Sequence, residues 1–413
     1  MYFELPFDNL SSVVDGDYVI ATYYVFGISN ITALKKAGQY AVGQSIGTWL
    51  PIPGITKEMI ENWQARVLSL YSLPTEENIC ILRIAFPHHN FASCFAMMLT
   101  AMVGNDISTA LRVKLVDLEL TPKALSAYTG PKQGVEGFRK ATGVYGRPLV
   151  LNMIKPCLGY SPEHGAKLFY ESALGGVDLI KDDEVFGNTS ISDVVGRLKA
   201  YRSVARSVME KTGKEPVYIA NITDTPKRMR DHAKMAVDED AKAVMVNIVT
   251  TGIDIFRELT EEFGNKLCFL AHYAGAGMLD SRDLGISGNV LLGVLARLAG
   301  ADSVMTMTAQ GDTALMLECV RTVQKHKLPM GQIKPVMTSL GGGVTPLSIK
   351  SLTDTFGHDI ILGVGGAIQG HPMGTTAGAM AVMQSISATC EGKELAETAK
   401  TSPELQAAID AWQ

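Results

Sequence analysis

No apolar run in this 413-residue sequence approaches the roughly 20 residues that a helix needs to cross a bilayer. Residues 1–11 carry acidic side chains where a signal peptide would be basic. The six cysteines lie far apart and lack the CxxC spacing of a zinc or redox motif. We therefore expect a cytoplasmic protein with reduced thiols and no membrane contact.

Positive charge is also sparse and scattered. The chain has 37 Lys and Arg against 42 Asp and Glu, with no basic stripe of the kind that nucleic-acid binding requires. We therefore expect no nucleic-acid partner. Hydrophobic residues make up 46% and charged residues 19%, a balance typical of a globular chain, and the length predicts one large domain and a smaller one.

Short β-branched runs alternate with helical patterns from about Arg147 onward, which is typical of βα units and a parallel sheet. Ser161-Pro162, Thr225-Pro226 and Thr345-Pro346 each place a hydroxyl cap before a first-turn proline, a helix-start signal. A doubly wound dinucleotide fold would show a GxGxxG turn after its first strand, and none is there. We predict a closed (β/α)8 TIM barrel, an α/β fold. The predicted strands are Pro148–Pro156, Val177–Glu184, Pro216–Thr223, Ala243–Val249, Leu267–His272, Ser303–Thr308, Pro335–Leu340 and Ile360–Gly366.

Residues 1–125 follow a different pattern and predict a smaller α+β, ferredoxin-like domain. Gly130-Pro131 marks the join, because glycine and proline interrupt regular structure. The predicted domains are therefore residues 1–125 and a barrel with C-terminal helices over residues 126–413. The elements expected in the first domain are strands at Asp17–Val25, Ile79–Phe86 and Val113–Leu120 and helices at Ala33–Val42 and Phe91–Val103.

The C-terminal ends of the predicted barrel strands, where barrel enzymes carry their catalytic groups, are polar. Lys155 lies at the end of the first strand, Lys181-Asp182-Asp183-Glu184 ends the second, and His272 ends the fifth. Lys181 and Asp183 point to one side of a strand, and Glu184 joins them only if the backbone leaves strand geometry. The two carboxylates suit Mg²⁺, and CO2 would convert the neutral amine of Lys181 into a carbamate ligand. An isolated KDDE run is more often a solvated ion-pair cluster, but its place at a strand end favours the metal site.

Glycines follow the last two predicted strands, at Gly341–Gly343 and at Gly365-Gly366. Barrels often bind phosphate at these strand ends, where backbone N–H groups meet the anion. Tight turns alone would explain the same glycines. With glycines at both strand ends, we favour a phosphate site and a phosphorylated substrate.

The segment Gly175–Glu184, which reads GGVDLIKDDE, resembles the metal-site motif of RuBisCO and RuBisCO-like proteins. The resemblance extends to Gly47-Thr48-Trp49, to Gly104-Asn105, to His272 and to Gly365–Pro372, and so it spans nearly the whole chain. It implies a homodimer in which the N-terminal domain of one subunit covers the barrel mouth of the other. The residues that it implies for the phosphate are Thr48, Trp49, Gly342, Gly343, Gly365 and Gly366.

The same resemblance implies a Mg²⁺ ion bound by carbamylated Lys181, Asp183 and Glu184. Lys155 and His272 would be acid/base or substrate-orienting groups, and Asn105 would reach the active site of the partner subunit. The enolases of methionine salvage resemble this chain further but use a lysine at the position of Asn105. Lys155 is then the candidate base, with a pKa lowered by nearby cationic charge.

Several positions depart from the carboxylating members of the family. Those members carry a lysine on the loop after the sixth strand, where this chain has Gln310–Thr313. Cys157 replaces a second lysine after the first strand, and Gly43 replaces an N-terminal glutamate. At the second phosphate site, arginine, histidine and serine are replaced by Tyr273, Met305 and Gly341. We therefore predict a monophosphate substrate, with Tyr273 and Met305 either lining an apolar pocket or packing at the rim.

These features predict a Mg²⁺-dependent RuBisCO-like enzyme that forms a metal-stabilised enolate from a monophosphorylated ketose or diketo sugar derivative and does not fix CO2. Enolisation, isomerisation and decarboxylation of a phosphorylated β-keto sugar acid would use the same kind of site. Decarboxylation therefore remains an alternative reaction. A non-catalytic sugar-phosphate binder would leave Lys155, Lys181, Asp183 and Glu184 without a purpose. Residual ribulose-bisphosphate carboxylase activity is disfavoured by the missing loop lysine.

Overall fold

The structure is a computed structural model that describes residues 7–28, 30–48, 52–73, 78–110, 112–308 and 313–412. Two compact units divide the chain. The larger comprises Gly130–Ala274, Ala299–Pro329 and Lys334–Gln413, and the smaller comprises Met1–Thr129, Gly275–Leu298 and Met330–Ile333. The smaller unit thus includes three segments that the division at residue 125 assigns to the barrel domain, namely residues 126–129, 275–298 and 330–333. Among the described residues, no helix has both the length and the apolar character that a membrane span requires.

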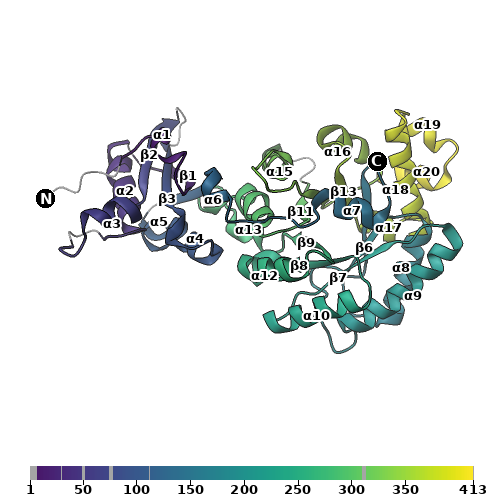
Figure 1. Cartoon of the computed structure of the whole chain (residues 1–413). Helices are drawn as coiled ribbons and strands as arrows, with labels where there is room; N and C mark the ends of the chain where they lie inside the picture. The colour runs from purple at the N-terminus through teal and green to yellow at the C-terminus, as the bar shows by residue number, and fades with distance from the viewer. Residues whose placement is uncertain are drawn as a thin grey trace. The chain divides into compact units, whose positions relative to one another are not determined.

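Eight strands close a parallel barrel in the larger unit, in the order β11-β12-β13-β5-β6-β7-β8-β9 (Figure 1). Each predicted strand is present, and this confirms the predicted barrel. Lys181, Asn221 and His272 are the last residues of their strands, so their side chains belong to one end of the barrel. The strands are β5 (Leu149–Met153), β6 (Leu179–Lys181), β7 (Val217–Asn221), β8 (Ala243–Asn247), β9 (Cys268–His272), β11 (Ser303–Met307), β12 (Met337–Gly341) and β13 (Ile360–Val364).

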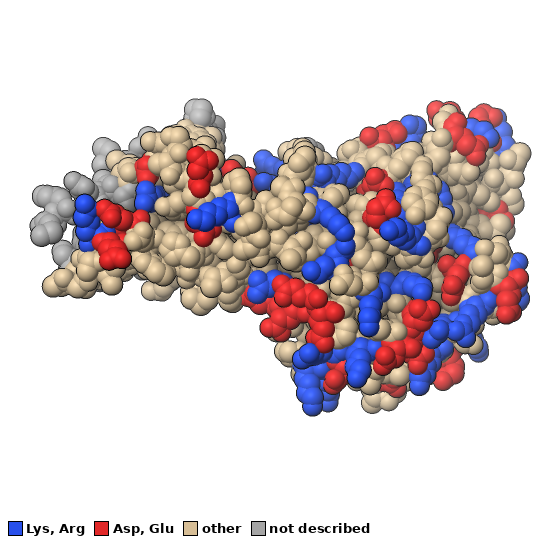
Figure 2. Space-filling model, viewed as in Figure 1, with Lys and Arg blue, Asp and Glu red and all other residues tan. Residues whose placement is uncertain are grey.

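Helices surround the barrel strands (Figure 1). On the face drawn in Figure 2, their Lys and Arg side chains are interspersed with Asp and Glu, so neither sign of charge dominates that view. The helices of this unit are α7 (Gly134–Thr142), α8 (Pro162–Leu174), α9 (Val194–Thr212), α10 (Pro226–Asp238), α11 (Ile248–Thr251), α12 (Ile253–Phe263), α15 (Thr313–Lys327), α16 (Ile349–Phe356), α17 (Gly366–Gln369), α18 (Thr375–Cys390), α19 (Leu395–Ala399) and α20 (Pro403–Trp412).

Two of the three predicted helix starts are correct. Ser161 caps α8 with its hydroxyl, which accepts a hydrogen bond from the N–H of His164 at 3.3 Å, and Thr225 precedes α10. The start predicted at Thr345-Pro346 is wrong, because α16 begins only at Ile349. The hydroxyl of Ser348 bonds both the N–H and the C=O of Thr345, and it holds this segment in a turn before the helix.

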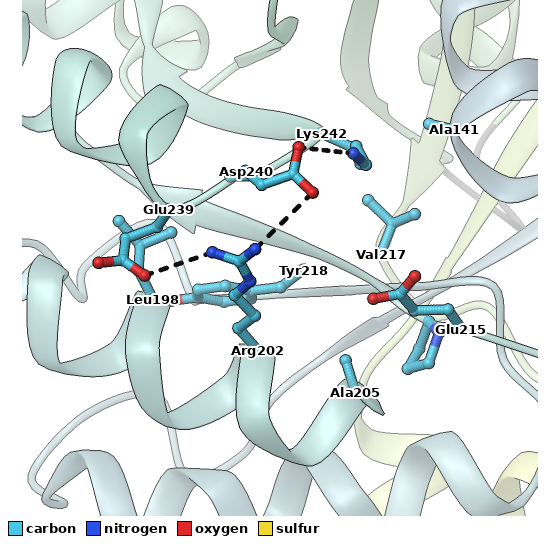
Figure 3. A pocket seen from close by; sticks show the side chains of 12 residues that line it. Ala141, Leu198, Arg202, Ala205, Glu215, Val217, Tyr218, Glu239, Asp240 and Lys242 are labelled. Atoms are coloured by element: carbon cyan, nitrogen blue, oxygen red, sulfur yellow. Dashed lines mark hydrogen bonds and ion pairs between the residues drawn. The ribbon is translucent and has the colours of Figure 1, made fainter. Parts of the chain in front are cut away.

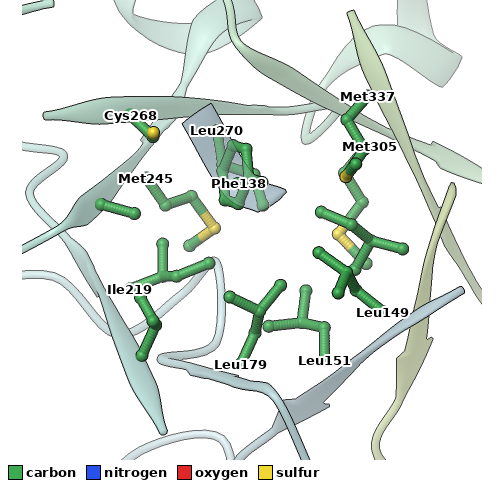
Figure 4. Packing of buried hydrophobic residues seen from close by; sticks show 13 residues of the cluster. Phe138, Leu149, Leu151, Leu179, Ile219, Met245, Cys268, Leu270, Met305 and Met337 are labelled. Atoms are coloured by element: carbon green, nitrogen blue, oxygen red, sulfur yellow. The ribbon is translucent and has the colours of Figure 1, made fainter. Parts of the chain in front are cut away.

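Fully buried side chains from the strands fill the barrel interior (Figure 4). Phe138 of α7 packs among the first residues of the strands, such as Leu149 and Leu179, so α7 closes the N-terminal end of the barrel. Gly137 permits this close approach, since an added Cβ would lie 2.7 Å from the sulfur of Cys268. Burial of a phenylalanine contributes about 1.5 to 3 kcal/mol. Only the opposite, C-terminal end is left for chemistry.

Asp302 ties the start of β11 to its surroundings through three backbone N–H groups. Its Oδ1 accepts from Gln133 and Gly134 at 2.9 and 2.6 Å, and its Oδ2 accepts from Phe269 at 2.9 Å. Burial raises the pKa of Asp302 to about 6, and these N–H groups oppose the rise.

We expect Asp302→Asn to lower the free energy of unfolding by about 1 to 3 kcal/mol, because the new amide group would face the N–H of Phe269. Urea denaturation measures the loss. The exposed Asp354→Asn serves as the matched control and should change stability by less than about 0.5 kcal/mol. Equal effects in the two variants would contradict the structural role of Asp302.

A five-stranded sheet in the order β10-β4-β1-β3-β2 forms the smaller unit. The three predicted strands are present, and β2 and β10 were missed because β2 has no apolar alternation and β10 has two residues. The helix predicted at Phe91–Val103 begins later, at Phe95. The strands are β1 (Tyr18–Phe26), β2 (Arg66–Leu73), β3 (Ile79–Pro87), β4 (Arg112–Leu120) and β10 (Gly285–Ile286). The helices are α1 (Leu10–Val13), α2 (Asn30–Gly43), α3 (Lys57–Trp63), η1 (His88–Asn90), α4 (Phe95–Val103), α5 (Asn105–Ala110), α6 (Pro122–Leu125), α13 (Ala276–Leu279), η2 (Asn289–Leu295) and α14 (Ala296–Leu298).

Candidate active site

Lys181 is the last residue of β6, and its side chain is fully buried. Its Nζ donates to the backbone oxygen of Asp182 at 2.8 Å. The strand ends here, and the N–H of Phe186 closes a turn onto the backbone oxygen of Asp183 at 3.1 Å. The backbone therefore leaves strand geometry before Glu184, and the carboxylates of Asp183 and Glu184 both act electrostatically on Lys181.

Burial lowers the pKa of Lys181 to about 8, although the carboxylates of Glu184, Asp183 and Asp182 favour its charged form. Part of the amine is therefore uncharged near neutral pH, and the uncharged amine is the form that reacts with CO2. Within the described part of the chain, no group of three or more His, Cys, Asp or Glu side chains is placed to hold a metal ion. Asp183 and Glu184 supply two hard oxygen ligands, so the donor set fits Mg²⁺ once Lys181 supplies a third.

Lys155 lies beside this motif, two residues after the end of β5. Its Nζ donates to Asp183 Oδ2 at 2.5 Å and to Cys157 Sγ at 3.0 Å. Burial lowers the pKa of Lys155, but the hydrogen bonds to Asp183 and Cys157 outweigh this and raise it overall. In this arrangement Lys155 is an ammonium group, and nearby cationic charge does not lower its pKa as the sequence suggested.

His272 ends β9 and is buried. The N–H of Ala274 donates to His272 Nδ1 at 3.1 Å, so the ring proton belongs on Nε2, which lies 3.7 Å from Glu184 Oε2. Burial and then the neighbouring Lys181 lower the pKa of His272 to about 2, against the opposing effect of Asp183. His272 is therefore a neutral imidazole that presents an N–H donor.

Asp182, the remaining acid of the KDDE segment, points away from this cluster. Its Oδ2 accepts from Arg197 Nε at 3.1 Å, from Tyr218 Oη at 2.7 Å and from the N–H of Asn221 at 3.0 Å. Asp182 and Arg197 are both fully buried. Asp182 therefore anchors the turn that carries Asp183, and it is not a candidate ligand.

Two asparagines that the sequence analysis did not include in the site complete this support. The side-chain amide of Asn221 donates to the backbone oxygens of Asp183 and Glu184, both at 3.1 Å. The side-chain amide of Asn247 donates to the backbone oxygen of Glu184 at 2.9 Å. Both asparagines end barrel strands, and that position is the signal that could have identified them.

The glycines after β12 and β13 present bare backbone at the same end of the barrel. Gly342 and Gly343 have φ of +89° and +71°, a region that side chains disfavour. A Cβ built on Gly343 or Gly366 would meet no atom within 4 Å, and one on Gly365 would lie 3.4 Å from Lys155 Cε. Both loops therefore leave space in which an anion could approach the backbone.

The side chain of Met305 occupies the space that a side chain at position 341 would need. A Cβ added to Gly341 would lie 2.3 Å from Met305 Cε, and Met305 is buried in the barrel core. Met305 therefore packs in the core and does not line a pocket. Tyr273 is partly buried, and its ring stacks on His272 with centroids 4.7 Å apart.

We expect Gly341→Ala to cost about 1 kcal/mol of stability, because Met305 must move from its place in a packed core. The same substitution in a Met305→Ala background should cost nothing further, since the clash is then absent. A double-mutant cycle by urea denaturation measures the difference. Equal costs in the two backgrounds would show that the two positions do not compete for space.

The smaller unit carries the other predicted residues. Thr48 is exposed, and Asn105 begins α5 with an exposed side chain. Trp49 and the Gln310–Asp312 part of the loop after β11 lie outside the described residues.

A small cavity of about 70 Å³ lies at the other end of the barrel strands (Figure 3). Val217 and Lys242, at or just before the starts of β7 and β8, contribute to its wall. Arg202 lies between Glu239 and Asp240, at 3.5 and 3.9 Å, so its charge is already balanced. Barrel enzymes keep their chemistry at the C-terminal end of the strands, so this cavity is not the candidate active site.

Residues 134–412 match the family described as the ribulose bisphosphate carboxylase large chain, catalytic domain, and residues 7–125 match the N-terminal domain of the same chain. The chain belongs to the RuBisCO large-chain family. The resemblance seen in the GGVDLIKDDE segment is thereby confirmed.

The relatives of this RuBisCO-like chain include a carboxylase-like protein and enolases. It is 35% identical over 405 residues to a ribulose bisphosphate carboxylase-like protein of Archaeoglobus fulgidus, covering 94% of this chain and 92% of the relative. It is 32% identical over 409 residues to a 2,3-diketo-5-methylthiopentyl-1-phosphate enolase of Geobacillus thermodenitrificans, covering 95% of this chain and 98% of the relative. A rubisco-like protein from Alicyclobacillus acidocaldarius superposes with a TM-score of 0.89 at 32% identity, over 96% of this chain and all of that chain. An octameric Rubisco from Pyrococcus horikoshii superposes with a TM-score of 0.88 at 32% identity, over 96% of this chain and 93% of that chain.

Proposed function

We propose that this RuBisCO-like chain is a Mg²⁺-dependent enzyme that removes a proton beside the ketone of a monophosphorylated ketose or diketo sugar derivative and does not fix CO2. The observation that carries the proposal is the cluster of Lys181, Asp183 and Glu184 at the end of β6, with Lys155 bonded to Asp183. The enolase relatives at about 30% identity support the same class of reaction.

Lys181, Asp183 and Glu184 are the residues that would hold the metal. The neutral amine of Lys181 would add to CO2 and release one proton, which converts the lysine into an anionic oxygen ligand. A bound Mg²⁺ would supply a Lewis acid for the negative charge that develops on the ketone oxygen. Asn221, Asn247 and the Asp182 network hold the backbone of these ligands in place.

Lys155 is the proposed base, and its contact with Asp183 sets its protonation state. Asp183 Oδ2 accepts the hydrogen bond that keeps Lys155 charged. If Asp183 Oδ2 instead bound the metal, Lys155 would lose the hydrogen bond that stabilises its charged form, and the pKa of Lys155 would fall toward the range of a base. His272, neutral with its proton on Nε2, would donate to a substrate oxygen and orient it.

The glycine loops after β12 and β13 are proposed to bind the single phosphate. Gly342, Gly343, Gly365 and Gly366 supply backbone N–H groups without side chains that would block the anion. We further propose a homodimer in which Thr48, Trp49 and Asn105 of one subunit complete the site of the other. Related Rubisco structures are described as dimeric in Hyperthermus butylicus and octameric in Pyrococcus horikoshii.

Solvent deuterium exchange tests this proposal. The protein, with Mg²⁺ and bicarbonate, would be followed by NMR with phosphorylated ketoses, diketo methylthio-pentyl phosphates and branched β-keto acid phosphates. Exchange beside the ketone of a monophosphate is the expected result. CO2 release without exchange would replace the enolase proposal by decarboxylation, and binding without either would replace it by a non-catalytic role. CO2 fixation on ribulose bisphosphate would overturn it.

A further inference from the structure

A second group of reactive side chains lies in the smaller unit, where β1 and β3 pair antiparallel with Tyr18 opposite Pro87. Asp17 directly precedes β1 and His88 directly follows β3, so this register makes them neighbours. The N–H of His88 donates to the backbone oxygen of Asp17 at 2.9 Å. His88 Nδ1 lies 3.2 Å from Asp17 Oδ1, a buried oxygen that accepts no hydrogen bond of good geometry among the described residues, so the contact between the two side chains is electrostatic.

The turn after His88 brings a serine to the other ring nitrogen. The N–H of Phe91 bonds to the backbone oxygen of His88 at 3.2 Å, and the N–H of Cys94 bonds to that of Phe91 at 2.8 Å. Ser93 Oγ then lies 3.1 Å from His88 Nε2. One histidine ring therefore joins a carboxylate on one side to a hydroxyl on the other.

The backbone that holds Ser93 is strained. Ala92 and Ser93 have φ of +45° and +63°, the left-handed region that residues with a Cβ rarely adopt. Strain of this kind concentrates at functional sites, where the surrounding structure enforces it. Helix α4 begins at Phe95, two residues later, so the serine lies in the turn between η1 and the positive end of the α4 dipole.

The ring of His88 is set up to accept a proton from Ser93. Asp17 favours the tautomer with the proton on Nδ1, which leaves the lone pair of Nε2 facing the serine. Burial lowers the pKa of His88, against the opposing effect of Asp17, and so the neutral ring dominates at pH 7. The hydroxyl of Tyr128 lies 3.3 Å from the same nitrogen and shares it with Ser93, and the ring of Phe91 packs edge-on against the imidazole.

We propose that Ser93, His88 and Asp17 form a hydrolytic site for small carboxylic esters, separate from the barrel site. Ser93 Oγ would bond to the ester carbonyl carbon while its proton passes to His88 Nε2. The C–O bond of the ester would break, and the alcohol would leave with that proton. Water would then add to the acyl-serine by the same route, which releases the acid and restores Ser93. The overall reaction consumes one ester and one water and yields one acid and one alcohol.

The test uses the full-length protein, a fluorophosphonate probe and p-nitrophenyl butyrate. We expect one probe adduct, placed on Ser93 by peptide mass spectrometry, and ester hydrolysis that falls at least about 100-fold in Ser93→Gly and His88→Gln. Ser93→Gly removes the hydroxyl and also relieves the left-handed backbone, so loss of activity cannot be attributed to added strain. Thermal unfolding of each variant reports on its fold.

Ser126→Ala and Cys94→Ser are the matched controls, since they remove another hydroxyl and the adjacent thiol from the same unit. Both should keep the labelling and the hydrolysis rate. Absence of a Ser93 adduct in the wild-type protein, or hydrolysis that persists in Ser93→Gly, would overturn the proposal. These assays use neither Mg²⁺ nor a sugar phosphate, so their outcome is independent of the barrel reaction.

Discussion

Lys181→Ala should reduce Mg²⁺-dependent deuterium exchange by at least about 1000-fold, which corresponds to roughly 4 kcal/mol of transition-state stabilisation. On the proposed function the substitution would remove the third oxygen ligand, and with two carboxylates alone the metal site would be incomplete. NMR exchange rates with and without Mg²⁺ measure the loss. A second readout, independent of activity, is the carbamate signal in the ¹³C NMR spectrum of protein equilibrated with ¹³C-labelled bicarbonate.

Lys167→Ala, on the exposed face of α8, is the matched control for loss of a lysine, and it should keep both the exchange and the carbamate signal. Full activity in Lys181→Ala would contradict the carbamate proposal. Activity that depends on Lys181 without any carbamate signal would instead assign the buried lysine a role as an amine.

Arg197→Leu should lower the free energy of unfolding by about 3 to 5 kcal/mol, because it leaves Asp182 charged and buried without its partner. Both side chains of this pair are fully buried, and Arg197 also donates to the backbone oxygens of Ser192 and Gly187 at 2.8 and 3.0 Å. Burial raises the pKa of Asp182, and Arg197 is the main group that opposes this rise. Guanidinium denaturation measures the loss.

Arg228→Leu offers the matched control, since Arg228 is exposed and lies 3.7 Å from Asp224 one helical turn away. Its loss should cost less than about 0.5 kcal/mol. Adding Asp182→Asn to Arg197→Leu should recover part of the stability, because the unpaired charge disappears. A loss below about 1 kcal/mol in Arg197→Leu would mean that the pair does not anchor the turn.

The barrel was predictable because each of its strands is a short β-branched run that a helical pattern follows. The approach of Lys155 and His272 to the Lys181–Glu184 segment was predictable for a related reason, since parallel strands bring their C-terminal ends to one edge. Glu184 can join Lys181 and Asp183 only if the strand ends before it. The structure ends β6 at Lys181, and this satisfies the condition that the sequence left open.

Other features depend on side-chain geometry that the sequence does not specify. KDDE presents three acids, and only the positions of Arg197 and Tyr218 show that Asp182 faces away from the site. The raised pKa of Lys155 follows from a 2.5 Å contact with Asp183 that spans two strands. The helix start expected at Thr345 failed because Ser348 closes a turn there first.

The volume shared by Met305 and Gly341 constrains how this family member can change. A larger residue at position 341 meets the methionine, whereas a smaller residue at position 305 leaves a void in the core. A change at either position alone therefore gives a destabilised protein. The cost of changing one position therefore depends on the residue at the other, and substitutions at positions 305 and 341 are epistatic.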